Sequence, residues 1–127
     1  MKISEVLVAI GDVKPSQYEP ATMIRWISDL DGKVYEDIMA GFEGCPEKPE
    51  LPYSPKNQLA SLLIPFPHED VYVKWLMAQI DFHNADFDRY NNSMLMFDEA
   101  YQSFADAYAR NHKRIPVHIK GVRGDFA

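Results

Sequence analysis

The residues that could perform chemistry in this chain are few and lie far apart. His83 and Asp86 stand three positions apart, a spacing that would bring two metal ligands onto one face of a helix. No other acid–histidine pair matches them, so we interpret both as surface or interface hydrogen-bonding groups. Cys45 lies among glycines and prolines with no histidine near it in the sequence, so we expect no catalytic role for its thiol.

A second candidate is the acidic stretch around Asp31, which resembles part of a calcium-binding loop. If Gly32 took the sixth loop position, the first and twelfth positions would be Ile27 and Ile38, which carry no oxygen ligands. We therefore interpret Asp29 and Asp31 as members of a solvated helix face. Because the sequence also holds no glycine-rich phosphate loop and no nucleophile elbow, we expect a protein that is not an enzyme and needs no cofactor.

Length and composition indicate a single domain. The chain has 127 residues, of which 46% are hydrophobic and 13% aromatic, enough for a modest core. No apolar run approaches the ~20 residues of a membrane span, and the first residues lack the apolar core of a signal peptide. A lone cysteine excludes an internal disulfide. We therefore expect the protein to be made and kept in a cytoplasm.

The charge of the chain is acidic overall but unevenly distributed. A net charge of −6 argues against a general nucleic-acid binder. Beyond residue 111, however, Asp125 is the one acid, whereas four of the 13 basic residues lie there: Lys113, Arg114, Lys120 and Arg123. From charge alone, docking of this segment onto an acidic neighbour and contact with nucleic-acid phosphates both remain open.

Helices must position these residues. Apolar side chains recur at spacings of three and four in segments that predict four helices, at residues 3–12, 20–39, 69–90 and 93–111. We expect an all-α fold, a small bundle in which the helix at 69–90 packs against the second and fourth. The apolar phase slips at residues 90–93, which predicts a helix end there, with Asn92 or Ser93 as the next N-cap. One continuous bent helix is the alternative.

The predicted helix at 69–90 is apolar on two opposite sides, at about 100° per residue. The first side holds Val71, Trp75, Ala78, Phe82 and Ala85, of which we expect Trp75 and Phe82 in the core. A short chain covers one side of a helix easily, so the second side needs another cover. Four residues of that second side are therefore predicted at a subunit interface or under the proline-rich connection: Val73, Met77, Ile80 and Phe87.

Two segments are predicted to be non-helical. Residues 41–67 hold six of the nine prolines, and Pro46, Pro49, Pro52 and Pro55 fall at a period of three that favours polyproline II. Residues 112–127 form a basic tail, and the alternating pattern at 115–120 is typical of an edge strand. We expect a single helical domain at 1–111, with the proline-rich connection at 41–67 within it, followed by this extended tail.

Several stretches in combination resemble a known family. They are KISEVL at 2–7, IRWIS at 24–28 with LDG at 30–32, AQID at 78–81, and YNNSM at 90–94 running on to Phe97, Tyr101 and Phe104. Together they resemble the head–tail connector proteins, also called adaptor or head-completion proteins, of tailed phages and prophages of Gram-positive bacteria. The resemblance covers most of the chain except the proline-rich connection and the last dozen residues, and none of its motifs is catalytic.

The resemblance implies an all-helical virion structural protein. It implies a ring beneath the portal, assembled in the host cytoplasm, with DNA passing through as cargo and no membrane partner. Its partners would be further copies of the chain, the portal and other head–tail proteins. Since an acidic lumen repels phosphates, we predict that the basic tail docks onto the next subunit or the portal rather than onto DNA. The alternative is a small helical interaction or regulatory module of phage or prophage origin.

Overall fold

The computed structural model describes residues 1–116 and confirms a helical fold. Four α-helices follow one another: α1 at Ile3–Val13, α2 at Pro20–Asp37, α3 at Asp70–His83 and α4 at Phe87–Asn111, with a short 3-10 helix η1 at Met39–Gly41. Within the described part there is no strand, only two isolated antiparallel bridges. No helix of that part is long and apolar enough to cross a membrane.

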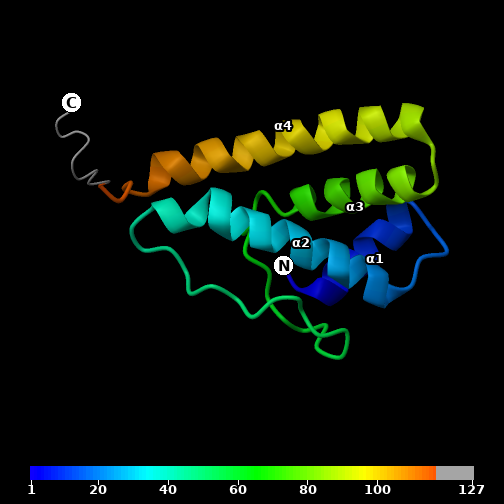
Figure 1. The fold of residues 1–127 in the computed structure, drawn as a ribbon, viewed down its shortest axis with the longest axis horizontal. Coiled ribbons are helices and arrows are strands. Elements are labelled where there is room, and N and C mark those ends of the chain that lie inside the picture. The colour runs from blue at the N-terminus through cyan, green and yellow to red at the C-terminus, as the bar shows by residue number, and fades with distance from the viewer. Residues whose placement is uncertain (117–127) are drawn as a thin grey trace, which may run out of the picture.

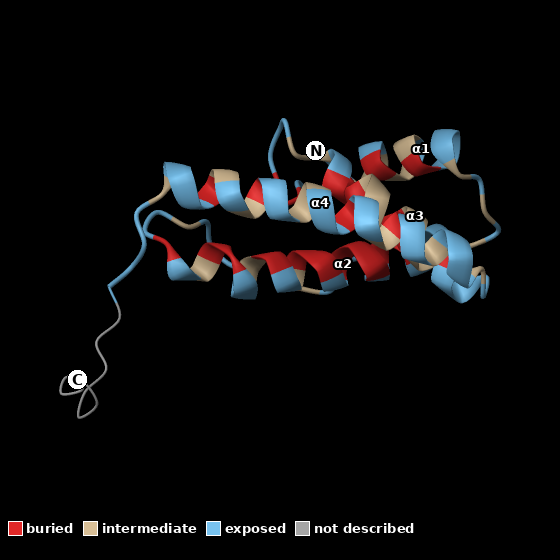
Figure 2. Cartoon of the chain, turned by 90° about the horizontal axis from the view of Figure 1, so that it is seen from above, coloured by how far each residue is buried: buried red, intermediate tan, exposed pale blue. Residues whose placement is uncertain are grey.

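The centre of the arrangement is α3. It lies between α4 on one side and α1 and α2 on the other (Figure 1), and it contacts all three. The predicted packing of this helix against the second and fourth is therefore confirmed, with α1 as an additional neighbour. The pattern of burial agrees with this arrangement. The faces of α1, α2 and α4 that point inward are buried, and their outward faces are exposed (Figure 2).

Burial on two sides explains the double apolar pattern of α3. Its buried residues point both to the α1 and α2 side and to the α4 side: Val71, Tyr72, Leu76, Ala78, Ile80 and Asp81. Ile80 of the second side is 1% exposed, so that side is covered at least there within the same chain and not by another subunit. The first side faces α4, since the Trp75 ring lies 5.0 Å from that of Phe97 and the Phe82 ring 5.3 Å from that of Tyr90. The α3–α4 hairpin makes this possible, since it lays the 25-residue α4 along the whole of α3.

The predicted helix boundary at residues 90–93 is wrong. The chain turns at residues 84–86 instead, and α4 runs unbroken through Asn92 and Ser93. Ala85 adopts a left-handed φ of 59°, while its N–H donates to the Phe82 carbonyl and the Asp86 N–H donates to the Asp81 carbonyl. This pair of bonds is a Schellman motif. Asp86 then caps α4, because its Oδ1 accepts from the Arg89 N–H at 3.4 Å.

The connection between η1 and α3 runs back across the N-terminus of the chain. Ile3 N donates to the Ala60 carbonyl and Leu62 N donates to the Met1 carbonyl, and an isolated bridge joins Lys2 to Ser61. Leu62 and Ile64 are buried in the core. The end of the connection therefore packs under the helices, although Leu59 is exposed.

Candidate functional site

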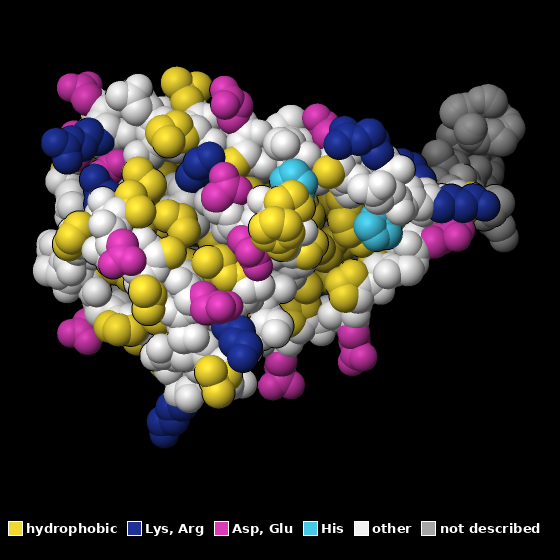
Figure 3. Space-filling view, turned by 180° about the vertical axis from the view of Figure 1, so that it is seen from behind, with side chains coloured by type: hydrophobic (Ala, Val, Ile, Leu, Met, Phe, Trp, Pro, Cys, Tyr) yellow, Lys and Arg dark blue, Asp and Glu magenta, His cyan; other side chains and the backbone are white. Residues whose placement is uncertain are grey.

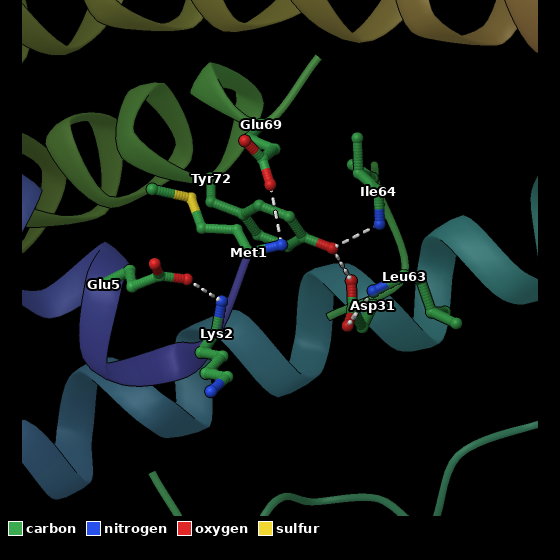
Figure 4. Close-up of polar contacts among 8 residues, drawn as sticks. All are labelled: Met1, Lys2, Glu5, Asp31, Leu63, Ile64, Glu69 and Tyr72. Atoms are coloured by element: carbon green, nitrogen blue, oxygen red, sulfur yellow. Dashed lines mark hydrogen bonds and ion pairs between the residues drawn. The ribbon is translucent and has the colours of Figure 1, made fainter. Parts of the chain in front are cut away.

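The most elaborate polar arrangement in the described chain surrounds Asp31 on α2, whose exposed fraction is 0%. Its Oδ1 accepts from the Tyr72 hydroxyl at 2.5 Å, and its Oδ2 accepts from the Tyr53 hydroxyl at 2.6 Å and from Leu63 N at 3.2 Å. The Tyr72 hydroxyl in turn accepts from Ile64 N at 2.8 Å (Figure 4). One carboxylate therefore ties α2 to α3 and to the connection.

The prediction that Asp31 belongs to a solvated helix face is wrong, although Asp29 two positions away is exposed. Burial raises the pKa of Asp31, and the hydrogen bonds from Tyr53, Tyr72 and Leu63 oppose that rise. Burial and the nearby Asp31 charge also raise the pKa of Tyr72 well above its usual range. With its acceptor oxygens occupied by protein donors, the Asp31 carboxyl is arranged to hold the fold together.

Ser28 extends this network by one turn of α2. Its hydroxyl donates to the Ile24 carbonyl at 2.8 Å and accepts from Tyr53 N at 2.9 Å. Tyr53 is thus held through both its backbone and its hydroxyl. The proline-rich connection is consequently pinned to α2 at this residue.

A second buried polar contact joins α1, α3 and α4. Asp81 is buried, and its Oδ2 accepts from the Ser93 hydroxyl at 2.6 Å. Its Oδ1 pairs with the Lys14 ammonium at 2.8 Å. The hydroxyl that was expected to cap a helix therefore bonds across the α3–α4 pair, which explains why Ser93 is tolerated inside α4.

The residues predicted at a subunit interface are placed unevenly. Ile80 is 1% exposed and lies in the core, so its assignment to an interface is corrected. Val73 and Met77 are half-buried and pack against the core cluster. Phe87 is 56% exposed and is the member of the set most open to a partner.

Phe82 was expected in the core, but it is 47% exposed because α3 ends one residue later. Its ring lies 6.1 Å from that of Phe87 and 5.3 Å from that of Tyr90. We call Phe82, Phe87 and Tyr90 the junction aromatic cluster. Trp75 is half-buried as a packed side chain, with its ring 5.0 Å from Phe97 and its Nε1 donating to the Trp26 carbonyl at 2.8 Å.

The basic tail begins against its own chain. Glu43 N donates to the Lys113 carbonyl at 2.8 Å, and Ile115 N donates to the Gly41 carbonyl at 2.9 Å. Between them the Arg114 guanidinium lies 4.7 Å from the centre of the Phe42 ring. Lys120 and Arg123, the other predicted docking residues, lie outside the described residues, as does most of the predicted edge strand.

The three residues first considered for chemistry, His83, Asp86 and Cys45, make contacts that belong to the fold. The His83 ring lies 4.9 Å from the Trp26 ring, tilted by 31°, and Asp86 caps α4. Residues 1–116 contain no group of three or more His, Cys, Asp or Glu side chains that could hold a metal ion. Cys45 is a half-buried free thiol beside the core.

Comparison with protein-family models, with curated proteins and with solved structures finds no match to this chain. The stretches at 24–28, 30–32, 78–81 and 90–94 include Ser28, Asp31, Asp81 and Ser93. All four are buried polar residues, and each bonds to a side chain or backbone group of another segment.

The Asp31 network escaped sequence reasoning because its three donors lie 22, 32 and 41 positions away along the chain. A polar residue on an amphipathic helix normally faces water, so a solvent-facing position was the expectation for Asp31. One signal was present. The stripe of apolar residues on α2 has Asp31 beside Leu30, Ile27 and Val34, which places the carboxyl at the edge of the apolar face.

Proposed function

We propose that this protein is a non-enzymatic virion structural protein, a head–tail connector subunit that assembles into a ring beneath the portal. One observation carries the proposal. The stretches on which the family resemblance rests also supply the buried polar contacts of the fold, at Ser28, Asp31, Asp81 and Ser93. Apolar spacing alone is common to all amphipathic helices. Buried polar residues specify how particular helices meet, so a resemblance that includes them supports a similar fold.

The junction aromatic cluster supports a contact with a neighbouring copy. Phe82 and Phe87 are large, about half exposed, and adjacent to Tyr90 at the end of the bundle where α3 meets α4. Aromatic side chains are enriched at the centres of protein interfaces. In a ring, this end of one subunit would meet the side of the next.

The charge supports a channel through which DNA slides. Net charge is −6 although the segment after residue 111 is basic, so the helical body carries the acidic excess. An acidic lumen repels phosphates without preference for sequence, which suits passage rather than binding. The basic tail then serves contacts between proteins. DNA is a cargo and not a ligand.

The deciding experiment is the particle formed by the full chain with its portal. The chain is co-expressed with the portal protein of the phage or prophage that encodes it, and particles are weighed by mass photometry and imaged by negative-stain electron microscopy. We expect an added ring on the portal. Phe87→Ser should weaken that ring, whereas the matched control Leu95→Ser, also exposed on α4, should leave it intact.

Two results would contradict the proposal. Monomers or small oligomers that ignore the portal would favour the alternative, a small helical interaction or regulatory module. In a gel-shift assay, binding of the chain to DNA at physiological salt should be negligible. Tail-dependent binding that falls steeply as salt rises would instead make the tail a phosphate contact.

A further inference from the structure

A groove runs between the C-terminal half of α4 and the segment that leads into α3. Its apolar part, of about 150 Å³, has Phe104, Ala107 and Tyr108 of α4 on one side and Phe66 and Pro67 on the other. Its polar part, of about 320 Å³, is lined by Asp70, Lys74, Glu99 and Ser103. Pro67 and His68 line both parts, so the two adjoin. We call the whole the loop–helix groove.

The apolar part of the groove is open to solvent. Phe66 on its rim is 82% exposed, the largest exposed fraction among the large hydrophobic side chains described. The space-filling view shows hydrophobic side chains gathered beside histidines on this hollowed face (Figure 3). An aromatic rim around an apolar floor is the chemistry that holds aliphatic side chains of a peptide.

The polar part of the groove is suited to a cation. Asp70 pairs with Lys74 at 2.9 Å, whereas Glu99 makes no ion pair within residues 1–116. Glu99 thus presents a carboxylate at the far end of the groove from Tyr108. A lysine or arginine entering there gains an unshared acidic partner.

The order of residues in the last part of the chain matches this groove. Residues 117–127 begin with Val117 and Ile119 and continue with Lys120 and Arg123. From Tyr108 to Glu99, α4 spans nine residues, or ~14 Å at 1.5 Å per residue. From Ile119 to Arg123 an extended chain spans four residues, also ~14 Å. With Ile119 beside Tyr108, Arg123 therefore reaches Glu99.

We infer that the loop–helix groove receives residues 117–127 of a neighbouring copy of the chain. The subunit's own chain passes the end of the groove at Asn111 and His112, which also line its apolar part, and is then held at Lys113 and Ile115 by hydrogen bonds to Glu43 and Gly41. The end of the described chain lies past the C-terminal end of α4, away from the start of α3 (Figure 1).

The inference deepens the proposed function and rests on it in one respect, that copies of the chain meet. It names the contact between them: apolar residues of one tail in the apolar part, and Lys120 or Arg123 against Glu99. Lys113 and Arg114 stay with their own subunit. Of the four residues predicted to dock the tail, Lys113 and Arg114 thus contact their own subunit, and Lys120 and Arg123 contact the neighbour.

The first experiment measures self-association of the full chain by sedimentation velocity over a range of protein and salt concentrations. Glu99→Lys and Arg123→Glu should each weaken association roughly tenfold. The chain carrying both changes should regain most of it, since the charges are exchanged. Asp106→Lys, the same charge change at an exposed site on α4 outside the groove, should have little effect. Unchanged association in both single variants would overturn the inference.

A second experiment separates a neighbour's tail from the subunit's own. In a Cys45→Ser background, one full chain carries Ser103→Cys and a second, of different mass, carries Gly121→Cys, which the same register places opposite each other. Oxidation of the mixture should yield the mixed disulfide, and Glu99→Lys should suppress it. A further chain carries both cysteines. If a disulfide forms within that chain but none forms between the two singly substituted chains, the inference is overturned, and so it is if no disulfide forms at all.

The two proposals can fail separately. A ring that still forms on the portal with Glu99→Lys alone and with Arg123→Glu alone would leave the proposed function standing and remove the groove contact. Groove-dependent association with no binding to the portal would remove the proposed function and leave the groove contact.

Discussion

The Tyr72 hydroxyl donates to Asp31 Oδ1 at 2.5 Å, and both side chains have an exposed fraction of 0%. The same hydroxyl accepts from Ile64 N at 2.8 Å, so a single bonded chain of groups crosses from α2 through α3 to the connection. A buried carboxylate without hydrogen-bond donors would lower the stability of the fold, and so would buried hydroxyl and N–H donors without the carboxylate. The contact therefore makes the relative placement of α2 and α3 depend on one residue.

Removal of that carboxylate should destabilise the protein. Asp31→Ala leaves the hydroxyls of Tyr53 and Tyr72 without their acceptor in the interior. We expect a loss of about 2–4 kcal/mol in the free energy of unfolding, measured with urea, because each orphaned buried group costs about 1–3 kcal/mol. Asp31→Asn, which keeps one acceptor oxygen, should lose less.

The matched control for Asp31 is Asp29→Ala. Asp29 is exposed and pairs only loosely with Arg25, at 3.7 Å. Its removal should change the free energy of unfolding by no more than about 0.5 kcal/mol. Equal effects at the two positions would show that the Asp31 network does not stabilise the fold.

Trp75 and Phe82 share one side of α3 but should differ in their contribution to stability. Trp75→Ala removes the ring packed on Phe97 and the bond from Nε1 to the Trp26 carbonyl. We expect a loss of about 2–3 kcal/mol, below the ~3–5 kcal/mol of a fully buried tryptophan. Phe82→Ala should cost less than about 1 kcal/mol, since the side chain is half exposed. Thermal melts of the two variants side by side would test this order, and the reverse order would contradict the orientation of α3.

Ala85→Gly should stabilise the protein. Ala85 has a φ of 59°, the left-handed conformation that helix-ending glycines adopt without steric cost. We expect a gain of about 0.5–1 kcal/mol in the free energy of unfolding. Ala105→Gly, the same change within α4, should instead lose about 1 kcal/mol. A loss at both positions would argue against the turn at residues 84–86.

Stability should fall at alkaline pH. Burial, with the Asp37 charge as a second cause, raises the pKa of Tyr101 to about 12, and burial and Asp31 raise that of Tyr72 further above its usual range. A tyrosine whose pKa is raised on folding contributes stability that is complete below its unfolded pKa of ~10 and is lost as pH rises through the folded value. The free energy of unfolding should therefore decline above pH ~10.

Phenolate absorbance measured alongside helical circular dichroism would check this. The buried tyrosines should ionise together with the loss of helix, whereas exposed tyrosines ionise earlier. In Tyr72→Phe the decline should still begin above pH ~10 but be less steep, because one of the titrating groups is gone. Full ionisation of every tyrosine in the folded chain near pH ~10 would contradict the burial of Tyr72 and Tyr101.

The sequence alone determined that the chain is helical and where most helices lie, because each amphipathic stripe is a local property of residues three and four positions apart. Pro20 at the start of α2 and the apolar residues of α1 were sufficient for those elements. The two apolar sides of α3 were also visible. Which neighbour covers each side was not, because α4 packs along α3 only after the turn at Ala85 reverses the chain.

Tertiary structure decided where the polar residues Ser93 and Asp31 lie and what they bond to. Ser93 was expected at a helix end because Asn and Ser favour caps, but Asp81 offers its hydroxyl a buried acceptor, so α4 continues. Asp31 was expected in water, and donors from three distant positions bring it into the core. Hydrogen-bond partners far apart in the chain leave no periodicity in the sequence. Apolar contacts along one helix do, and for that reason the helices were predictable while the network that joins them was not.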